Sequence, residues 1–183
     1  MKYCNDIRDL VGKTPLLKLN NLDVKKGVNI FAKLECFNPG GSSKDRVGMY
    51  MIEKTEREGR LKKGYTIIEA TAGNTGIGIA LAELNKGYKV IFIVPEKFSI
   101  EKQKIMMALG GEIINTPKKD GMEGAINLAE KMLKEIPNSI SLKQFENSSN
   151  PLAHYETTGR EIYEDLDGQV DYVVAGAGSG GTY

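Results

Sequence analysis

The sequence predicts an α/β protein in which helices cover both faces of an open, parallel β-sheet. Strand-like and helix-like segments alternate along almost all of the 183 residues, and repeated strand–helix units favour parallel pairing. The run KVIFIVP (89–95) is apolar throughout, which is typical of a strand buried on both faces. Glycine-rich loops follow several predicted strands, at the edge of the sheet where α/β proteins bind their ligands.

The first predicted units each place a helix after a strand. VNIFAKLE (28–35) is a candidate strand, and a glycine-containing loop joins it to a helix over 43–60. TIIEAT (66–71) is apolar and β-branched, which favours a strand, and a helix over 74–86 follows it. The apolar strand 89–95 comes next and ends at a proline.

The middle of the chain continues the alternation. Ser99 is expected to cap a helix that ends near Leu109, before two glycines, and EIINTP (112–117) is a short strand. The helix after it has the clearest period, because apolar side chains recur every three or four residues until Pro137. Its apolar face comprises Met122, Ala125, Ile126, Ala129, Met132 and Leu133.

The last part of the chain is predicted to contain a strand SISLKQF (139–145), a helix over 155–166 and a strand DYVVAGAG (171–178). The pattern breaks over 147–151, which indicates a passage between two lobes. The chain then stops in GAGSGGTY, a glycine-rich turn of the kind that precedes a helix. We therefore expect it to be a fragment of a longer polypeptide.

Charge and apolar patterning argue against several classes of protein. Lys and Arg number 25 and Asp and Glu 24, whereas proteins that bind nucleic acid or anionic membranes carry a basic face. The longest apolar runs are strand-sized, so no membrane span is expected. The N-terminus has acids where a signal peptide is apolar, and the expected compartment is the cytoplasm.

Cysteine and histidine usage predicts no metal site. Cys4 and Cys36 form no CxxC pair and no disulfide framework, and Cys36 is interpreted as a buried small hydrophobe. His154 is the only histidine, which excludes metal clusters that need two. A structural, hydrogen-bonding histidine at the start of a helix is the favoured interpretation.

The first of three informative loops is NPGGSSKDR (38–46), which places Lys44 at the start of a helix. Near the positive end of a helix dipole and partly desolvated, the ammonium form is disfavoured and the amine becomes a better nucleophile. Such lysines react with carbonyl compounds. A solvated surface lysine is the alternative, and Asp45 and Arg46 are interpreted as helix-start and ion-pair residues.

The second loop, TAGNTG (71–76), joins a strand to a helix. Backbone N–H groups and hydroxyls converge at a helix N-terminus, which suits a carboxylate or a phosphate. The loop matches neither GxGxxG nor GxxxxGK[ST], so a dinucleotide site and a P-loop are both poorly supported. A tight turn with Asn74 or Thr75 as the N-cap is the alternative, and the two interpretations are compatible.

The third loop, GAGSGGT (176–182), follows the last predicted strand. Its four glycines, with Ser and Thr, would form a phosphate cradle of backbone amides and hydroxyls, and a flexible turn is the alternative. Gln144, at the end of a predicted strand, could reach a ligand or remain a surface amide. Together the three loops support a site more strongly than any one of them.

These motifs resemble the cysteine synthase (O-acetylserine sulfhydrylase) and cystathionine β-synthase family of pyridoxal-phosphate enzymes. The likeness runs from VGKTPL (11–16) to the final loop, with the lysine motif, the substrate-carboxylate loop and the phosphate loop in the family's order. PEKFSIEK, EIPNS and NPLAHYETT are similar to the cystathionine synthases, and GMEGAINLAE to the cysteine synthases. The implied fold is the tryptophan-synthase-β-like fold, type II, truncated at its C-terminus.

The resemblance implies a role for each matched residue. Lys44 would bind pyridoxal 5'-phosphate covalently and, once released, would remove the α-proton of an amino-acid substrate as general base. Asn74 would hydrogen-bond the cofactor's ring oxygen. Ala72 stands where many members have a serine. The phosphate would bind to Gly178, Ser179, Gly180, Gly181 and Thr182, and the substrate carboxylate to the loop of Thr71, Ala72, Gly73 and Thr75 with Gln144.

The implied reaction is β-replacement on an activated serine or cysteine. Its simplest form is that of cysteine synthase, which makes cysteine and acetate from O-acetylserine and sulfide. A cystathionine β-synthase-like enzyme or a sulfide-releasing enzyme is the alternative, and a non-catalytic, truncated binding protein is the rival from another class.

The resemblance also implies an assembly and a division into lobes. The family is dimeric, so a homodimer is expected, with no nucleic-acid or membrane partner. Residues 1–40 would belong to the second lobe, 41–146 would form the small N-terminal lobe and 147–183 would begin the larger C-terminal lobe. Because the family's C-terminal part is missing, we expect the fragment to be a poor catalyst or inactive.

Overall fold

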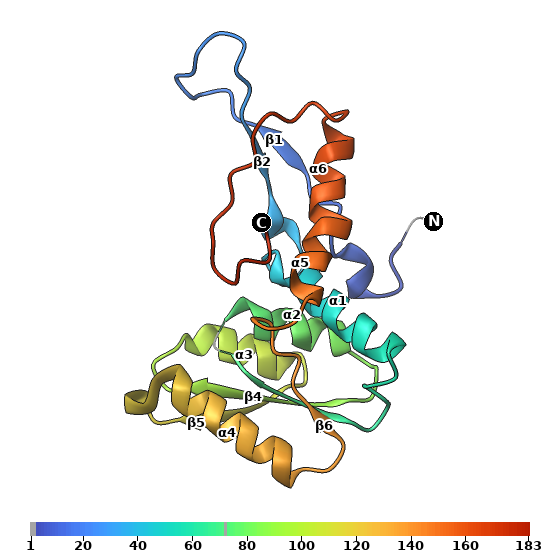
Figure 1. Cartoon of the computed structure of the whole chain (residues 1–183), viewed down its shortest axis with the longest axis vertical. Helices are drawn as coiled ribbons and strands as arrows, with labels where there is room; N and C mark the ends of the chain where they lie inside the picture. Colours follow the sequence, from blue (N-terminus) through green and yellow to red (C-terminus); the bar gives the residue numbers. More distant parts are fainter. Residues whose placement is uncertain (1–2, 72) are drawn as a thin grey trace.

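The computed structural model describes residues 3–71 and 73–183, and the lower part of the molecule in Figure 1 is built on a four-stranded sheet whose strands are all parallel. The strand order is β5–β4–β3–β6, so β3 and β4 are the inner strands. This sheet confirms the predicted α/β class. Its strands are β3 (Thr66–Ala70), β4 (Lys89–Pro95), β5 (Glu112–Thr116) and β6 (Ser139–Ile140).

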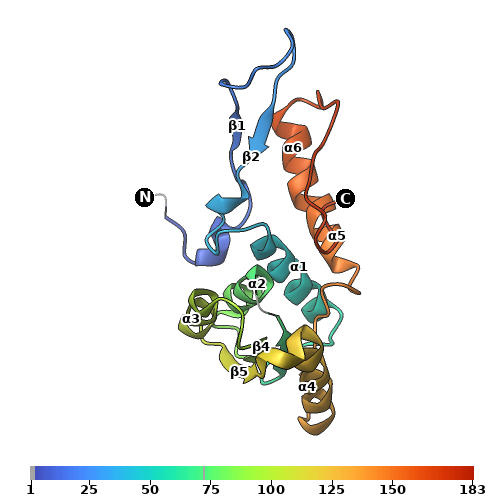
Figure 2. The same cartoon turned by 90° about the vertical axis from the view of Figure 1, so that its left-hand side faces the viewer.

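Helices cover both faces of this sheet, as predicted (Figure 2). One face packs against α1 (Lys44–Arg57), α2 (Asn74–Glu83) and α3 (Ile100–Ala108), and the other against α4 (Gly121–Glu135). Almost every residue of α2 is buried, which explains why its sequence is apolar all round rather than amphipathic. Ser99 caps α3 as expected, because its hydroxyl accepts a hydrogen bond from the Lys102 amide.

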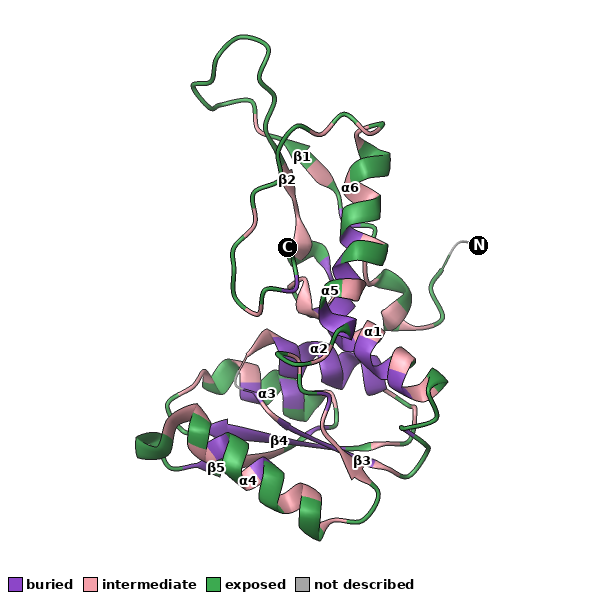
Figure 3. Ribbon diagram, viewed as in Figure 1, coloured by how far each residue is buried: buried purple, intermediate pink, exposed green. Residues whose placement is uncertain are grey.

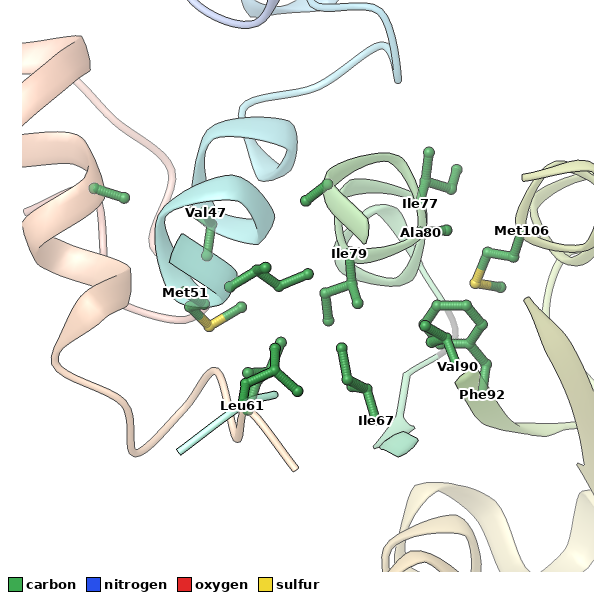
Figure 4. Close-up of a cluster of buried hydrophobic side chains, with 14 of the residues drawn as sticks. Val47, Met51, Leu61, Ile67, Ile77, Ile79, Ala80, Val90, Phe92 and Met106 are labelled. Atoms are coloured by element: carbon green, nitrogen blue, oxygen red, sulfur yellow. The ribbon is translucent and has the colours of Figure 1, made fainter. Parts of the chain in front are cut away.

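Two apolar clusters fill the space between the layers (Figures 3 and 4). The larger cluster joins side chains of α1, α2, α3 and the inner strands, and Figure 4 shows them converging above the sheet. Full burial of one such side chain stabilises the fold by roughly 2 kcal/mol. The larger cluster includes Val47, Met51, Ile67, Ile79, Phe92 and Met106; the smaller one comprises Ile68, Ile91, Ile93, Ala125 and Ala129.

The helices α1 and α2 touch through their backbones. A side chain at Gly48 would collide with the Gly78 carbonyl group, and one at Gly78 would collide with the Lys44 carbonyl group. Only glycine fits at both positions, so the two helices approach more closely than side chains permit. This contact fixes the first turn of α1, which begins at Lys44, against α2.

Residues before α1 and after β6 form a second region on the far side of α1 from the sheet (Figure 1). It contains a two-stranded antiparallel sheet and a helical segment in which a π-helical turn separates two short α-helices. Its elements are η1 (Ile7–Leu10), β1 (Leu16–Lys18), β2 (Phe31–Lys33), η2 (Glu35–Phe37), α5 (Ser149–Ala153), η4 (His154–Gly159) and α6 (Arg160–Asp165). The remaining short element, η3 (Lys118–Asp120), precedes α4.

A buried ion-pair network ties this second region to α1. The Arg46 guanidinium donates hydrogen bonds to both carboxylate oxygens of Glu35, at 2.8 Å, and to both of Glu161, at 2.6 and 2.8 Å. Lys33 adds ion pairs to Glu161 at 2.9 Å and to Asp165 at 3.0 Å. The interpretation of Arg46 as an ion-pair residue is confirmed.

The structure corrects several predicted boundaries. The strand predicted over 28–35 is only Phe31–Lys33, and the helix predicted over 155–166 begins earlier, at Ser149. Cys36 is exposed, so its interpretation as a buried hydrophobe is wrong; it lies on the outward-facing turn η2. The strand β1, which pairs antiparallel with β2, was not predicted from the sequence.

The strand predicted over 171–178 is absent. The segment is extended and irregular, and its apolar side chains Tyr172 and Val174 are 91% and 98% exposed. A buried strand needs neighbours that accept and donate its backbone hydrogen bonds. Among residues 3–71 and 73–183, no strand pairs with this segment. None of the helices described is both long enough and apolar enough to cross a lipid bilayer.

Candidate functional site

The loop before α1 is held by side-chain hydrogen bonds that position Lys44. The Asp45 carboxylate accepts a hydrogen bond from the Gly40 amide at 2.5 Å, and the Ser42 hydroxyl accepts one from the Lys44 amide at 3.2 Å. The buried Asn38 side chain accepts from the Gly12 amide at 2.8 Å. Asp45 therefore acts at the start of the helix, as expected, and the loop is ordered rather than loosely solvated.

The side chain of Lys44 is half-buried. Burial lowers the pKa of its ammonium group below the ordinary value. Its amine takes part in no hydrogen bond or salt bridge with the residues described. A desolvated amine without an anionic partner is a better nucleophile toward a carbonyl carbon.

The second loop ends in the N-terminus of α2. Gly73 is the N-cap residue and no side chain caps the helix there, so Asn74 and Thr75 are its first helical residues rather than the caps that the alternative interpretation expected. Uncapped amides at a helix N-terminus are available to an anion. Thr71 is buried and its amide donates to the Ile93 carbonyl at 3.2 Å. Ala72 lies outside the described residues.

A chain of hydrogen bonds joins this loop to the other predicted site residues. The Thr75 hydroxyl donates to the Gln144 side-chain oxygen at 2.6 Å. The Asn150 side-chain amide donates to the Gln144 carbonyl at 3.0 Å and to the Ser179 hydroxyl at 2.9 Å. Residues far apart in the sequence are thus brought together, and Gln144 is part of the site rather than a free surface amide.

The third loop is open on the side away from Asn150. Side chains added at Gly176 or Gly178 would meet nothing, whereas one at Gly181 would collide with the Asn150 side chain. Gly180 has a φ of +78°, which favours glycine. The loop amides from residue 176 to residue 182 donate to no backbone carbonyl in the described part of the chain. A cavity of about 240 Å³ lies between this loop and the segment from Gln144 to Pro151.

These residues fit pyridoxal 5'-phosphate in the chemistry of their donors. Lys44 supplies an unpaired amine for the aldehyde, and the third loop supplies free amides and two hydroxyls for the phosphate. The Asn150 side-chain oxygen is buried without a partner next to that loop. The described residues contain no group of three or more His, Cys, Asp or Glu side chains that could hold a metal ion.

The structure leaves some predicted residues apart. Asn74 and Thr182 make no side-chain hydrogen bond with the described residues, and Thr182 is exposed. His154 is buried, with its Nδ1 3.0 Å from the Thr158 hydroxyl, so it is a hydrogen-bonding helix residue as expected. Burial, with the charge of Lys44, lowers the pKa of His154 to about 4 and keeps its ring neutral at pH 7.

The sequence analysis missed Asn150, which contacts both Gln144 and Ser179. The only local signal was its place in the break over 147–151, before Pro151. It also missed Glu69, whose side chain contacts the segment leading to Gln144. Both contacts span more than one element, so no local pattern reveals them.

Comparison with known proteins gives the family. The model of the family described as "Pyridoxal-phosphate dependent enzyme" matches residues 7–183. An O-acetylserine dependent cystathionine beta-synthase of Bacillus subtilis is 55% identical over all of this chain, which covers 60% of that protein. A cysteine synthase of Flavobacterium is 49% identical over 99% of this chain, which covers 58% of that protein.

Solved structures agree with these sequence relatives. The crystal structure of O-acetylserine dependent cystathionine beta-synthase from Helicobacter pylori superposes with a TM-score of 0.93 at 46% identity, and this chain covers 60% of it. A hydrogen sulfide-producing enzyme from Fusobacterium nucleatum also superposes with a TM-score of 0.93, at 44% identity. The chain therefore spans about 60% of the length of such relatives. By the family match and these likenesses, the chain belongs to the pyridoxal-phosphate-dependent enzymes of fold type II.

Proposed function

We propose that the protein performs β-replacement on an activated serine, with O-acetylserine as the amino-acid substrate. The observation that carries the proposal is the chain of hydrogen bonds from Thr75 through Gln144 and Asn150 to Ser179. It links an uncapped helix N-terminus to a loop of free amides, which suits two anions bound side by side. A substrate carboxylate and a cofactor phosphate are two such anions.

In this proposal each residue has a defined task. Lys44 binds the cofactor through its amine and later carries the proton removed from the substrate α-carbon. Thr71, Gly73, Thr75 and Gln144 hold the substrate carboxylate. Gly178, Ser179, Gly180, Gly181 and Thr182 hold the phosphate, and Asn74 hydrogen-bonds the ring oxygen. When bound, pyridoxal phosphate supplies a ring that accepts electron density from the substrate.

The reaction needs a second substrate, for which there are two candidates. Sulfide, the acceptor of a cysteine synthase, is the candidate for the simplest form of the reaction, and the segment GMEGAINLAE is similar to that branch. A thiol such as homocysteine is favoured by the 55% identical relative, whose name is that of a cystathionine β-synthase. Product analysis with O-acetylserine and either acceptor separates the two: cysteine indicates the first and cystathionine the second. The hydrogen sulfide-producing relative supports a third assay, sulfide release from cysteine.

The test of the cofactor role uses Lys44. Pyridoxal phosphate added to the intact protein should give a visible absorption band, and borohydride reduction followed by peptide mapping should label Lys44. Lys44→Ala should abolish the label, and Lys44→Arg, which keeps the positive charge, should abolish it equally. Absence of a band at high cofactor concentration would favour a non-catalytic binding protein instead.

The lobe assignment and the setting remain proposals. We propose that residues 41–146 form the small lobe and that 1–40 and 147–183 belong to a larger one. We also propose that the protein is a homodimer in the cytoplasm. The support for the two lobes is the arrangement in which β1, β2 and α6 lie together, apart from the parallel sheet (Figure 1). Comparing turnover by this chain with turnover by a longer polypeptide tests the expectation that this chain alone is a poor catalyst, and equal rates would contradict it.

A further inference from the structure

A carboxylate lies in the inner strand β3, next to the predicted substrate loop. Glu69 is only 4% exposed. Because side chains alternate along a strand, Glu69 lies on the same face of the sheet as Ile67 and Thr71, the face that packs against α1 and α2. A buried carboxylate is costly unless hydrogen bonds compensate it. Its position therefore requires an explanation in terms of its partners.

The partners of Glu69 all come from the segment after β6. One carboxylate oxygen accepts hydrogen bonds from the Ser141 hydroxyl at 2.8 Å and from the amides of Leu142, at 2.9 Å, and Lys143, at 3.4 Å. Burial raises the pKa of Glu69, and hydrogen bonds from this segment oppose that rise. All of these donors thus belong to one short segment of the chain.

These hydrogen bonds explain why β6 is so short. The strand predicted over 139–145 pairs with β3 only at Ser139 and Ile140. Beyond Ile140, the Leu142 amide, which would continue the ladder, donates to the Glu69 carboxylate instead, and the Lys143 amide donates to the same oxygen. The chain therefore leaves the plane of the sheet at this point. Lys143 then adopts a left-handed conformation, with φ of +48°, and the backbone turns.

This turn determines where Gln144 lies. The Gln144 side-chain oxygen accepts a hydrogen bond from the Thr75 hydroxyl at 2.6 Å, and the Gln144 backbone carbonyl accepts one from the Asn150 side-chain amide at 3.0 Å. If residues 141–145 continued along β3 as a strand, Gln144 would be carried along the sheet edge. The direction of the backbone from Ser141 onward thus decides whether Gln144 meets Thr75.

We propose that Glu69 is a positioning residue for substrate recognition, whose carboxylate replaces the sheet ladder over residues 141–144 and so places Gln144 against Thr75. This inference rests on the proposed function, in which Gln144 and Thr75 hold the carboxylate of the amino acid. Glu69 acts entirely through the backbone of that segment and does not touch the ligand. Its removal should weaken amino-acid binding while leaving cofactor binding at Lys44 unchanged.

The test compares three variants of the intact protein. Glu69→Gln keeps the size of the side chain but removes its charge. Ser141→Ala removes one donor to Glu69, and Ser139→Ala is the matched control, because the Ser139 hydroxyl donates to Ile136 and Leu133 carbonyls instead. Two quantities are measured: hydrogen exchange of the amides of residues 142–144, and the dissociation constant of L-alanine, which has no leaving group, in the cofactor-loaded protein.

The expected effects differ between variants. Glu69→Gln should speed exchange of these amides and raise the dissociation constant of L-alanine about tenfold, in line with the loss of charge-assisted hydrogen bonds. Ser141→Ala should raise it about threefold, since one of the three donors is removed. Ser139→Ala should stay within about twofold of the wild type, and borohydride should still attach the cofactor to Lys44 in all three.

Each outcome bears on the inference. Unchanged exchange and unchanged L-alanine affinity in Glu69→Gln would overturn it, as would faster exchange without any loss of affinity. If Glu69→Gln does not fold, identical behaviour of Ser141→Ala and Ser139→Ala would overturn it. A wild-type protein that loads the cofactor yet shows no affinity for L-alanine would overturn the proposed function as well, which distinguishes the two failures.

Discussion

The contact between α1 and α2 leads to a prediction about stability. In Gly78→Ala, the new methyl group would overlap the Lys44 carbonyl oxygen and lie 2.7 Å from the Lys44 carbonyl carbon and 3.1 Å from the Asp45 nitrogen. These are backbone atoms, so no rotation of a side chain relieves the overlap. The two helices would have to separate by roughly 1 Å, which disrupts close packing on both sides.

The size of the effect follows from two opposing contributions. Overpacking in a well-packed core costs about 1–3 kcal/mol, and a collision with backbone belongs at the upper end. Replacing glycine by alanine inside a helix returns about 1 kcal/mol. The net loss in free energy of unfolding should therefore be about 2 kcal/mol. For a chain of this length, such a loss lowers the melting temperature by about 4–8 °C.

Urea denaturation followed by circular dichroism measures this loss, and Gly76→Ala is the matched control in the same helix. A methyl group at Gly76 would meet only side-chain atoms, the Met106 sulfur and, at 3.0 Å, the Thr71 methyl carbon. Side chains can shift where backbone cannot, so the change should stay within about 1 kcal/mol of the wild type. Equal stability of Gly78→Ala and Gly76→Ala would refute the argument that a backbone contact limits the approach of the helices.

Three further predictions concern the ion-pair network and the glycine loop. In urea denaturation, Arg46→Ala should lower the free energy of unfolding by about 3–5 kcal/mol, because the half-buried carboxylates of Glu35 and Glu161 lose their positively charged partner. The control Arg60→Ala removes an exposed ion pair and should lower it by at most about 0.5 kcal/mol. Burial alone would raise the pKa of Glu161, but hydrogen bonds, that from Arg46 first among them, lower it to about 2. The contribution of ionised Glu161 to folding stability is therefore complete above pH 4.5, the ordinary pKa of a glutamate, and is lost as the pH falls toward 2. Over that range the stability of Glu161→Gln should fall less steeply than that of the wild type, and parallel curves would contradict the assignment. Gly181→Ala should push the Asn150 side chain away from Ser179 and weaken pyridoxal phosphate binding about tenfold by absorbance titration, while Gly176→Ala, which meets open space, should not.

The sequence predicted the inner part of the fold well because its signals are local. The strand 89–95 is observed with those bounds, since a continuous apolar run reports burial on both faces wherever the chain goes next. Ser99 is likewise found as a helix cap because its contact spans three residues. The antiparallel strand β1 gave no such signal: it has three residues, two of them exposed, and its stability depends on β2.

The errors arise where structure depends on distant residues. The apolar pattern of 171–178 predicts a buried strand, but such a strand requires pairing partners, and none of the described strands pairs with this segment. The strand predicted over 139–145 ends at Ile140 because the Glu69 carboxylate, some seventy residues away in sequence, takes its amides. For the site, the three loops could be predicted from their glycines and hydroxyls, whereas the bridging Asn150 appears only when the chain is folded.

The brevity of β6 has a consequence for the solution behaviour of the protein. β6 is the outer strand of the sheet on its side, and it offers only two residues of pairing backbone before the chain turns away. A long, flat outer strand is a template on which a second polypeptide can add its own strand, the first step of aggregation. Because the Glu69 carboxylate accepts hydrogen bonds from amides after Ile140, those amides are not available to pair with a strand of another polypeptide.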